Sequence, residues 1–303
     1  MVKLKNGLIK FQNLLRGEVI LKEFEYLKPD SIKETILVLS QYGEKAQILN
    51  GGTDLIVEMR DKIIQPEYLV DIKAIPQLNR ITYSEQDGLH IGATVTLNEI
   101  SDSKVIQRNY PILAEACKTV GSYQVRNRAT LVGNICNASP AADTAPPLLV
   151  LDAKVNIIGP TGGKVVSINQ FFAGVKKNIL KKGEIVTSIT VPPIKDKWTG
   201  VYLKQGRRKE VDLATVGVAV LCVRDEVRIA LGAVAPVPVR AVKTEELLKG
   251  KTIDESLLEK AGKSALTEAS PISDVRSSQE YREEIIKVLV RRAVLQAKGE
   301  HIL

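Results

Sequence analysis

This chain of 303 residues contains few side chains that could carry out acid–base or nucleophilic catalysis. The sequence holds only two histidines, His90 and His301, and three cysteines, Cys117, Cys136 and Cys222. A hydrolase triad needs an imidazole between a nucleophile and an acid, and His90 lies in GLHIGA, a segment typical of a strand. No His/Cys/Asp cluster has metal-ligand spacing, and three scattered cysteines are too few to hold an iron–sulfur cluster. We therefore expect no catalytic side chain and no metal site, so a bound cofactor must carry any reaction.

A first candidate for a cofactor-binding loop is NGGTD at residues 50–54, between the expected strand AQIL and the segment LIVEMR. Adjacent glycines let backbone N–H groups come close to phosphate oxygens, and the hydroxyl of Thr53 adds a donor. The alternative is a simple strand-to-helix turn capped by Thr53 or Asp54. Another glycine-containing segment, IIGPTGGKVVS, has the wrong spacing for a phosphate loop and predicts a hairpin turn. The sequence contains no G-x-G-x-x-G, which argues against a Rossmann dinucleotide domain.

A second candidate is the long polar stretch VGSYQVRNRATLVGNICNASPAADTAPPLL at residues 120–149. Neither the helical nor the strand period fits it, although well-patterned segments flank it on both sides. The stretch carries two arginines around an asparagine, an isolated glycine–asparagine pair and Ser-Pro-Ala-Ala-Asp. Long irregular segments inside compact proteins are commonly functional, and this one is the natural partner of the NGGTD loop.

The elements before residue 191 alternate between strands and helices. Capping boxes at Ser31–Glu34 and Thr96–Glu99 predict two helix starts, and Gly43 ends the first of these helices. A further helix is expected at 110–120, and strands are expected at 46–49, 68–72, 88–95, 153–159, 163–168 and 184–193.

The prolines and charges of VPPIKDKW at residues 191–198 indicate a boundary, because the composition changes beyond it. Three strands are expected there, at 202–208, 214–223 and 226–234, with the last two forming a hairpin at RDE. Three helices follow at 243–250, 254–270 and 277–299. A Ser277–Glu280 capping box opens the last helix and Gly299 ends it.

Composition narrows the class of protein further. The net charge of +8 and the pI near 9.2 are compatible with nucleic-acid binding, but the basic residues are spread along the chain and aromatic residues make up only 4%. A single-strand-binding surface needs aromatic side chains beside a positive groove. No apolar run approaches the roughly 20 residues of a membrane span, and the N-terminus has no signal-peptide core. We expect a cytoplasmic protein with no nucleic-acid partner and no membrane span.

The segments ILNGGTDLIVEMR and VGSYQVRNRATLVGNICNASPAADTAPPLL together resemble the FAD-binding medium subunit of the molybdenum hydroxylases. This family includes carbon monoxide dehydrogenase, aldehyde oxidoreductases and the flavin domain of xanthine dehydrogenase. The resemblance continues through VDLATVGVAV, RIALGAVAPVPVRA and PISDVRSSQEYREEIIKVLVRRA, and it covers about residues 21–300. Three separated motifs in the same order make the resemblance specific.

The resemblance implies an α+β protein with the vanillyl-alcohol-oxidase/PCMH-type FAD-binding fold. The FAD-binding PCMH-type domain occupies residues 21–193, as two α/β subdomains at about 21–80 and 81–193. A C-terminal domain at 196–303, of the type found in the CO dehydrogenase flavoprotein, contains a three-stranded antiparallel sheet and helices. Residues 1–20 form an unmatched N-terminal arm.

The resemblance also places one FAD between the two polar stretches. The family's contact positions correspond to three groups of residues: Ile48, Leu49, Asn50, Gly51, Gly52, Thr53, Asp54 and Leu55; Thr130, Leu131, Val132, Gly133 and Asn134; and Val120, Gly121, Asp143, Lys177, Val186 and Lys204. Val132 stands where family members often have a second glycine. A lysine such as Lys204 beside the isoalloxazine ring favours the anionic reduced flavin. Valine at Gly51 or Gly52 is expected to abolish FAD binding and to leave the domain folded.

The function implied is that of an electron-transfer subunit of an oxidoreductase. In the family, a large molybdopterin subunit hydroxylates the substrate, and a small subunit with two-iron–two-sulfur clusters passes electrons to FAD and on to an external acceptor. The resemblance implies both subunits as partners in a dimer of heterotrimers, acting on a substrate such as an aldehyde or carbon monoxide. A stand-alone flavoprotein oxidase or dehydrogenase of the same fold is the alternative, and it needs a proton acceptor beside the flavin. A non-enzymatic assembly factor is a third possibility, against which the intact glycine loops argue.

Overall fold

A computed structural model describes residues 21–209 and 211–299, so the expected N-terminal arm at 1–20 and His301 lie outside the described residues. Its first sheet is parallel, with strand order β1-β3-β2, and the helices α1 and α2 accompany it. The bounds are β1 (Glu25–Leu27), α1 (Ile32–Tyr42), a short 3₁₀ turn (Gly43–Lys45), β2 (Ala46–Leu49), α2 (Leu55–Arg60) and β3 (Tyr68–Asp71). The Ser31 side chain caps α1 as predicted, but the carboxylate of Glu34 accepts from the N–H of Asp30 instead of that of Ser31.

The second sheet is antiparallel, with strand order β4-β5-β10-β6-β7. Its strands are β4 (Ile81–Ser84), β5 (Gly88–Gly92), β6 (Lys154–Gly159), β7 (Gly162–Ser167) and β10 (Ile185–Val191). The expected hairpin between β6 and β7 is confirmed, since Gly159 pairs with Gly162 across a two-residue turn. The strand expected at 88–95 ends early, because the chain turns at 93–94, where the N–H of Thr94 donates to the carbonyl of Leu78.

Short helices and a small hairpin cover this second sheet. They are α3 (Leu97–Asp102), α4 (Lys104–Asn109), α5 (Pro111–Lys118), α6 (Tyr123–Arg126), α7 (Leu131–Cys136) and α8 (Ala145–Val150), with 3₁₀ turns at Pro76–Leu78 and Ile168–Gln170 and the strands β8 (Phe172–Gly174) and β9 (Lys177–Asn178). The capping box predicted at Thr96 and Glu99 is complete. The long polar stretch at 120–149 therefore contains α6, α7 and most of α8, joined by loops.

The C-terminal sheet is antiparallel, in the order β11-β12-β13-β14. It contains β11 (Trp198–Gln205), β12 (Val216–Val223), β13 (Glu226–Gly232) and β14 (Val239–Arg240), so a fourth strand of two residues extends the three that were expected. The first strand lies earlier in the sequence than the expected range of 202–208. The strand starts at Trp198, which pairs with Val223, and it ends before the turn where the carboxylate of Asp212 accepts from the N–H groups of Arg207 and Arg208.

Helices α9 (Val242–Leu248), α10 (Glu255–Thr267) and α11 (Gln279–Lys298) follow the C-terminal sheet. The capping box predicted at Ser277 was wrong by one residue. Ser277 still pairs with Asp274 in an isolated bridge, and it is the Ser278 side chain that accepts from the N–H of Tyr281. Gly299 ends α11 in the left-handed conformation, as predicted.

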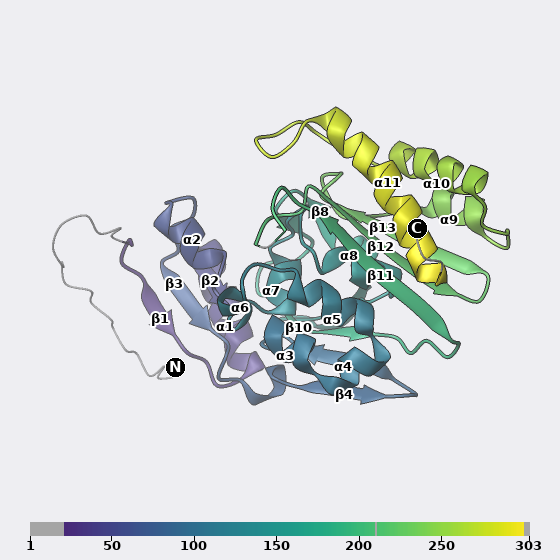
Figure 1. Cartoon of the computed structure of the whole chain (residues 1–303). Coiled ribbons are helices and arrows are strands. Elements are labelled where there is room, and N and C mark those ends of the chain that lie inside the picture. Colours follow the sequence, from purple (N-terminus) through teal and green to yellow (C-terminus); the bar gives the residue numbers. More distant parts are fainter. Residues whose placement is uncertain (1–20, 210, 300–303) are drawn as a thin grey trace.

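Strand β12 connects the two hydrophobic cores of the molecule. Ala219, Leu221 and Val223 belong to the core shared with the second sheet, whereas Val218 and Val220 belong to the core under α10 and α11. Every residue of β12 is buried, which explains why its sequence is an unbroken apolar run without alternation. Figure 1 shows the first sheet at one end of the molecule and α9–α11 at the other, with the C-terminal strands between α8 and those helices.

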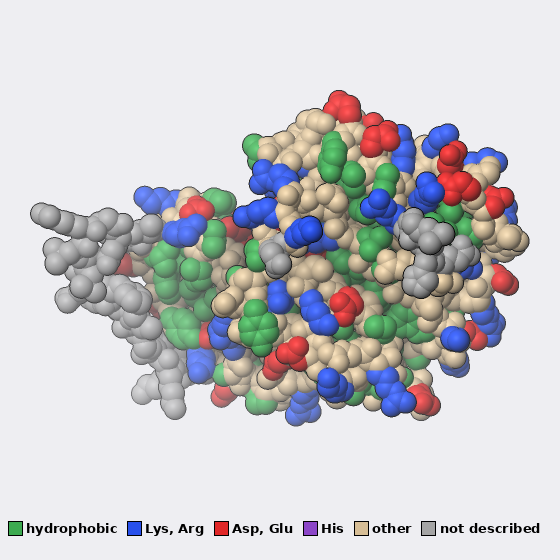
Figure 2. Space-filling model, viewed as in Figure 1, with side chains coloured by type: hydrophobic (Ala, Val, Ile, Leu, Met, Phe, Trp, Pro, Cys, Tyr) green, Lys and Arg blue, Asp and Glu red, His purple; other side chains and the backbone are tan. Residues whose placement is uncertain are grey.

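The surface and the helices add two observations. On the face shown in Figure 2, Lys and Arg are interspersed with Asp and Glu over the whole surface, with no continuous basic stripe. Among residues 21–209 and 211–299, no helix has the length and apolar character needed to cross a bilayer.

Candidate functional site

The NGGTD loop and the chain before α7 pack directly against each other. A Cβ atom added to Gly51 would lie only 2.3 Å from the carbonyl oxygen of Arg128 and 3.0 Å from the Cα of Ala129. The side-chain amide of Asn50 donates to the carbonyl of Ala93, at 2.7 Å. The two stretches that the sequence pointed to as candidate cofactor loops are therefore neighbours in space, although about eighty positions separate them in the chain.

The NGGTD loop presents a run of free backbone donors. Within the described residues, the N–H groups of Gly51, Gly52, Thr53, Asp54 and Leu55 form no hydrogen bond. Gly52 has a φ of +78°, a conformation that glycine adopts without strain. Asp54 is the N-cap of α2 but makes no side-chain capping bond, so the simple capped turn considered above does not account for this loop. Free N–H groups at a helix start form a ready anion-binding site.

Two buried polar atoms beside this loop also lack partners among the described residues. They are the amide oxygen of Asn50 and the hydroxyl oxygen of Thr94, and both residues are only 8% exposed. A buried polar group without a hydrogen bond is costly, so such atoms indicate where a polar ligand completes the structure. Thr94 was missed by the sequence analysis, because it falls in a segment that was expected to continue a strand.

Side-chain hydrogen bonds within the second stretch hold the polar groups around α7. The Thr130 hydroxyl oxygen accepts from the N–H of Gly133 at 3.0 Å and caps the helix, which leaves the O–H free to donate. The hydroxyl of Thr144 donates to the amide oxygen of Asn134 at 2.6 Å, which turns the amide NH₂ of Asn134 to other partners. Both predicted donors therefore remain available. The side chains of Leu131 and Val132 are buried in the apolar core, so the valine at the position of a family glycine adds no bulk to the loop surface.

The segment Val120–Gly121 is held by a side chain that the sequence analysis did not select. One guanidinium nitrogen of Arg126 donates to the carbonyls of Val120 and Gly121, at 3.0 Å each, and its Nε donates to Asn98 at 3.1 Å. Gly121 has a φ of +51°. The only signal in the sequence was the pair of arginines in QVRNR.

Asp143 and Lys204 meet across the boundary between the second and the C-terminal sheets. Their carboxylate and ammonium groups are 2.8 Å apart, and Lys204 Nζ also donates to the carbonyl of Thr119 at 2.9 Å. The hydroxyl of Tyr202 donates to the other oxygen of Asp143, at 2.8 Å. Burial raises the pKa of the Asp143 carboxyl above its ordinary value, and Lys204 and Tyr202 act in the opposite direction. The positive charge of Lys204 is thus partly balanced by Asp143. In the sequence analysis, this lysine was treated as an unpaired cation beside the flavin ring.

The two remaining predicted contacts lie at the edges of this region. Val186 is buried in β10, and Lys177 is an exposed residue of β9. The neighbouring Lys176 is better connected. Its ammonium pairs with Glu58 of α2 at 2.9 Å and donates to Asn137, just after α7, at 2.7 Å. It thereby ties the helix after the NGGTD loop to the helix of the second stretch.

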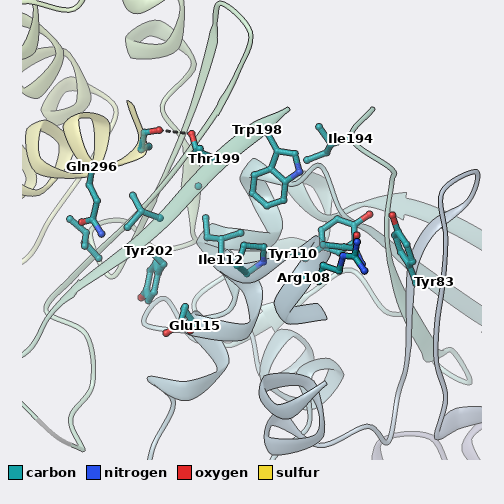
Figure 3. A pocket seen from close by; sticks show the side chains of 16 residues that line it. Tyr83, Arg108, Tyr110, Ile112, Glu115, Ile194, Trp198, Thr199, Tyr202 and Gln296 are labelled. Carbon is teal, nitrogen blue, oxygen red and sulfur yellow. Dashed lines mark hydrogen bonds between the residues drawn. The ribbon is translucent and has the colours of Figure 1, made fainter. Parts of the chain in front are cut away.

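A separate groove of about 640 Å³ lies between α4–α5 and β11. Trp198, Tyr110 and Tyr83 line one end of it, and Tyr202 and Glu115 line the other (Figure 3). No residue of the NGGTD loop or of the stretch at 120–149 lines this groove, so it is distinct from the cofactor-loop region. Tyr202 connects the two regions, because it lines the groove and its hydroxyl donates to Asp143.

These features together define a cradle for a phosphate-bearing cofactor. Free backbone donors and two unpartnered buried oxygens lie at the NGGTD loop, which packs against the second stretch. The Asp143–Lys204 pair adds a buried carboxylate and an ammonium group to the second stretch. Within the described ranges, no group of three or more His, Cys, Asp or Glu side chains could hold a metal ion. The arrangement can bind and orient a cofactor.

Comparison with known proteins gives the family. Residues 22–194 match the FAD-binding domain in molybdopterin dehydrogenase, and residues 201–297 match the CO dehydrogenase flavoprotein C-terminal domain. The chain therefore belongs to this family of FAD-binding domains, which confirms the resemblance seen in its sequence.

Named relatives cover nearly the whole chain. The xanthine dehydrogenase FAD-binding subunit of Escherichia coli O157:H7 is 31% identical over 278 residues, covering 90% of this chain and 95% of that protein. The carbon monoxide dehydrogenase medium chain of Hydrogenophaga pseudoflava is 33% identical over 276 residues (89% and 96%). The glyceraldehyde dehydrogenase medium chain of Sulfolobus acidocaldarius is 32% identical over 275 residues (89% and 97%).

A solved structure shares the fold. The structure of carbon monoxide dehydrogenase from Hydrogenophaga pseudoflava that lacks the Mo-pyranopterin moiety matches with a TM-score of 0.89 at 33% identity. The match covers 92% of this chain and 99% of that one. The α+β fold class with a PCMH-type FAD-binding part is thereby confirmed.

The residues of the cradle fit FAD. Its pyrophosphate requires several N–H donors and little side-chain bulk, which the Gly51–Leu55 backbone provides. Its ribityl and ribose hydroxyls require polar partners, which the Asn50 and Thr94 oxygens can provide.

Proposed function

We propose that this chain is the FAD-carrying electron-transfer subunit of a molybdenum hydroxylase complex. The observation that carries the proposal is the run of free N–H groups from Gly51 to Leu55 beside the unpartnered oxygens of Asn50 and Thr94. Membership of the FAD-binding family and the near-complete coverage of the relatives support it. The chain is an oxidoreductase subunit, and FAD is its cofactor.

The residues of this chain hold the cofactor and carry out no proton transfer of their own. FAD, when bound, exchanges one or two electrons and so connects one-electron carriers to an external acceptor. The NGGTD loop binds the phosphates, Thr130 and Asn134 donate to the cofactor from the opposite side, and Val120–Gly121 and Asp143–Lys204 border the flavin region. Leu131, Val132 and Val186 contribute backbone or packing, and Lys177 makes an outer contact.

The proposal extends to domains, partners and location. Residues 21–193 form the FAD-binding domain, with subdomains at about 21–80 and 81–193, and residues 196–303 form the C-terminal domain. The partners are a large molybdopterin subunit and a small iron–sulfur subunit, joined as a dimer of heterotrimers in the cytoplasm. The names of the relatives support a multi-subunit complex, because two of them are medium chains of dehydrogenases. These names span xanthine, carbon monoxide and glyceraldehyde, and the large subunit selects among such substrates.

The test is flavin binding by the purified chain. We expect one FAD per chain, released completely into the supernatant by acid precipitation, because neither glycine loop carries a histidine or cysteine placed for covalent attachment. His90→Ala is the matched control and should bind FAD as the parent does, since His90 lies on β5 and no role is assigned to it. A chain that binds no FAD at micromolar concentrations would refute the function.

Partner binding separates this function from that of a stand-alone oxidase. Co-expression with a large and a small molybdenum hydroxylase subunit should give a stable complex that transfers electrons from substrate to a dye. A flavin-loaded chain that oxidises small alcohols or amines by itself, with oxygen as acceptor, would favour the alternative.

A further inference from the structure

Tyr202 and Lys204 lie two residues apart on β11 and therefore point to the same side of the strand. Both contact Asp143, which belongs to the loop between α7 and α8. The Tyr202 hydroxyl donates to one carboxylate oxygen and the Lys204 ammonium donates to the other, each at 2.8 Å. Each oxygen of the Asp143 carboxylate thus has its own donor from the C-terminal sheet.

The neighbouring strand makes room for this tyrosine. Gly217 of β12 pairs with Lys204, and a Cβ atom at Gly217 would lie 2.7 Å from the Tyr202 hydroxyl oxygen. Any side chain at Gly217 would displace the hydroxyl from Asp143. The side chain of Tyr202 lines the groove beside α5 (Figure 3). Its hydroxyl donates to the Asp143 carboxylate.

The cluster is buried and lies next to the proposed flavin segment. Asp143 is 5% exposed and the Lys204 side chain 12%. Lys204 also holds the carbonyl of Thr119, which immediately precedes Val120–Gly121. A displacement of Asp143 would therefore change both a proposed FAD contact and the anchor of another.

We propose that Tyr202 is a positioning residue of the flavin site, which acts by fixing the Asp143 carboxylate against Lys204. This inference rests on the proposed function. It also gives the C-terminal sheet a part in shaping the cofactor site, by way of Asp143. Tyr202 does not touch reacting atoms in this scheme, since its effect passes through Asp143.

Tyr202→Phe removes the hydroxyl and keeps the ring in the groove. We expect the affinity of the apoprotein for FAD to fall by roughly five- to tenfold. This is less than for the loss of a direct hydrogen bond to a charged group, because Tyr202 acts on the cofactor only through Asp143. We also expect the midpoint potential of bound FAD to become more negative, because an O–H dipole that offsets the Asp143 charge is lost. Circular dichroism and thermal unfolding of the apoprotein should show that the variant remains folded.

Tyr83→Phe is the matched control. Tyr83 lines the same groove at the end away from Tyr202 (Figure 3), so neither affinity nor potential should change. In an Asp143→Ala background, Tyr202→Phe should have no further effect on FAD affinity, because the residue through which it acts is gone.

The outcomes separate this inference from the proposed function. If the parent chain binds FAD and Tyr202→Phe leaves both affinity and potential unchanged, or shifts the potential in the positive direction, the positioning role is wrong while the function stands. An equal loss of affinity in Tyr202→Phe with and without Asp143 would also overturn it. If the parent chain binds no FAD, the function itself fails.

Discussion

The two proposed flavin loops differ in how their polar groups are satisfied. The NGGTD loop leaves five successive N–H groups and two adjoining buried oxygens without partners in the described structure. The start of α7 is capped by Thr130, and Asn134 is held by Thr144. The first loop is thus incomplete without a ligand, whereas the second is a finished helix start that also offers donors. Substitutions in the first loop should act mainly on FAD binding, and those in the second mainly on the stability of the apoprotein.

Gly51→Val should have the largest effect, and it marks an exception to this contrast. The added side chain meets the Arg128 carbonyl, a backbone atom that cannot move aside alone. The two loops would be forced apart, so we expect loss of FAD binding together with destabilisation of roughly 1–3 kcal/mol. This adds a loss of stability to the expectation from sequence, which was loss of FAD binding in a domain that remains folded. Denaturant unfolding of the apoprotein measures the stability, and unchanged unfolding would show that the loops need not touch.

Thr94→Val is the sharpest test of the incomplete loop. It replaces a buried, unpartnered hydroxyl by a methyl group of similar size, so the apoprotein should be as stable as the parent or slightly more stable. FAD affinity should fall about five- to tenfold, or about 1–1.5 kcal/mol, if the cofactor bonds to this hydroxyl. Calorimetric titration with FAD gives the affinity.

Thr35→Val is the control for that experiment. Thr35 is also fully buried, but its hydroxyl already donates to the Ser31 carbonyl at 2.9 Å. This variant should lose stability and keep its FAD affinity, the reverse of Thr94→Val. If both variants changed stability and FAD affinity in the same way, the unpartnered hydroxyl of Thr94 would have no special role in FAD binding.

Thr130→Ala tests the finished loop. Loss of the cap should lower the free energy of unfolding of the apoprotein by about 1 kcal/mol, whereas Thr130→Ser, which keeps the oxygen, should stay close to the parent. The free energy of FAD binding should change less than the free energy of unfolding. Any further loss of affinity would report a hydrogen bond that the Thr130 hydroxyl donates to FAD. A variant with parent-like unfolding and no FAD binding would mean that Thr130 serves the ligand alone.

The smallest expected effect is on how the stability of the protein depends on pH in acid. Burial acts to raise the pKa of Asp71, but hydrogen bonds from Lys73 and Tyr26 outweigh it and leave the pKa below the ordinary 3.8. Lys73 also donates to the Asn50 carbonyl at 3.3 Å, so this pair supports the NGGTD loop. The stabilisation is present above the unfolded pKa and is lost as the pH falls through the folded pKa. Unfolding of Lys73→Met followed between pH 6 and pH 3 should depend less on pH than that of the parent, and equal slopes would contradict this.

The sequence by itself determined the family and the order of most elements, and it pointed to the two proposed flavin loops. Local signals were sufficient where the physics is local. The capping box at Thr96–Glu99 and the glycine at 299 specify helix ends through neighbouring residues. The apolar run of β12 predicts a buried strand, although only the structure shows that its two faces serve different cores. The error at Ser277 arose because the S-x-x-E pattern fits Ser277 and Glu280, whereas the actual cap, Ser278, has Tyr281 at the third position after it. Ser277 pairs instead with Asp274 in an extended bridge.

The tertiary structure alone decided how the site is assembled. Gly51 lies against Arg128, Asn50 bonds to Ala93 over 43 positions, and Tyr202 bonds to Asp143 over 59. No local pattern encodes such contacts, because they depend on how separate sheets pack. The unpartnered hydroxyl of Thr94 is likewise invisible in the sequence, since burial and the absence of a donor or acceptor are properties of the folded chain. The resemblance could therefore point to the loops, but it could not show that the C-terminal sheet supplies the tyrosine that holds Asp143 in place.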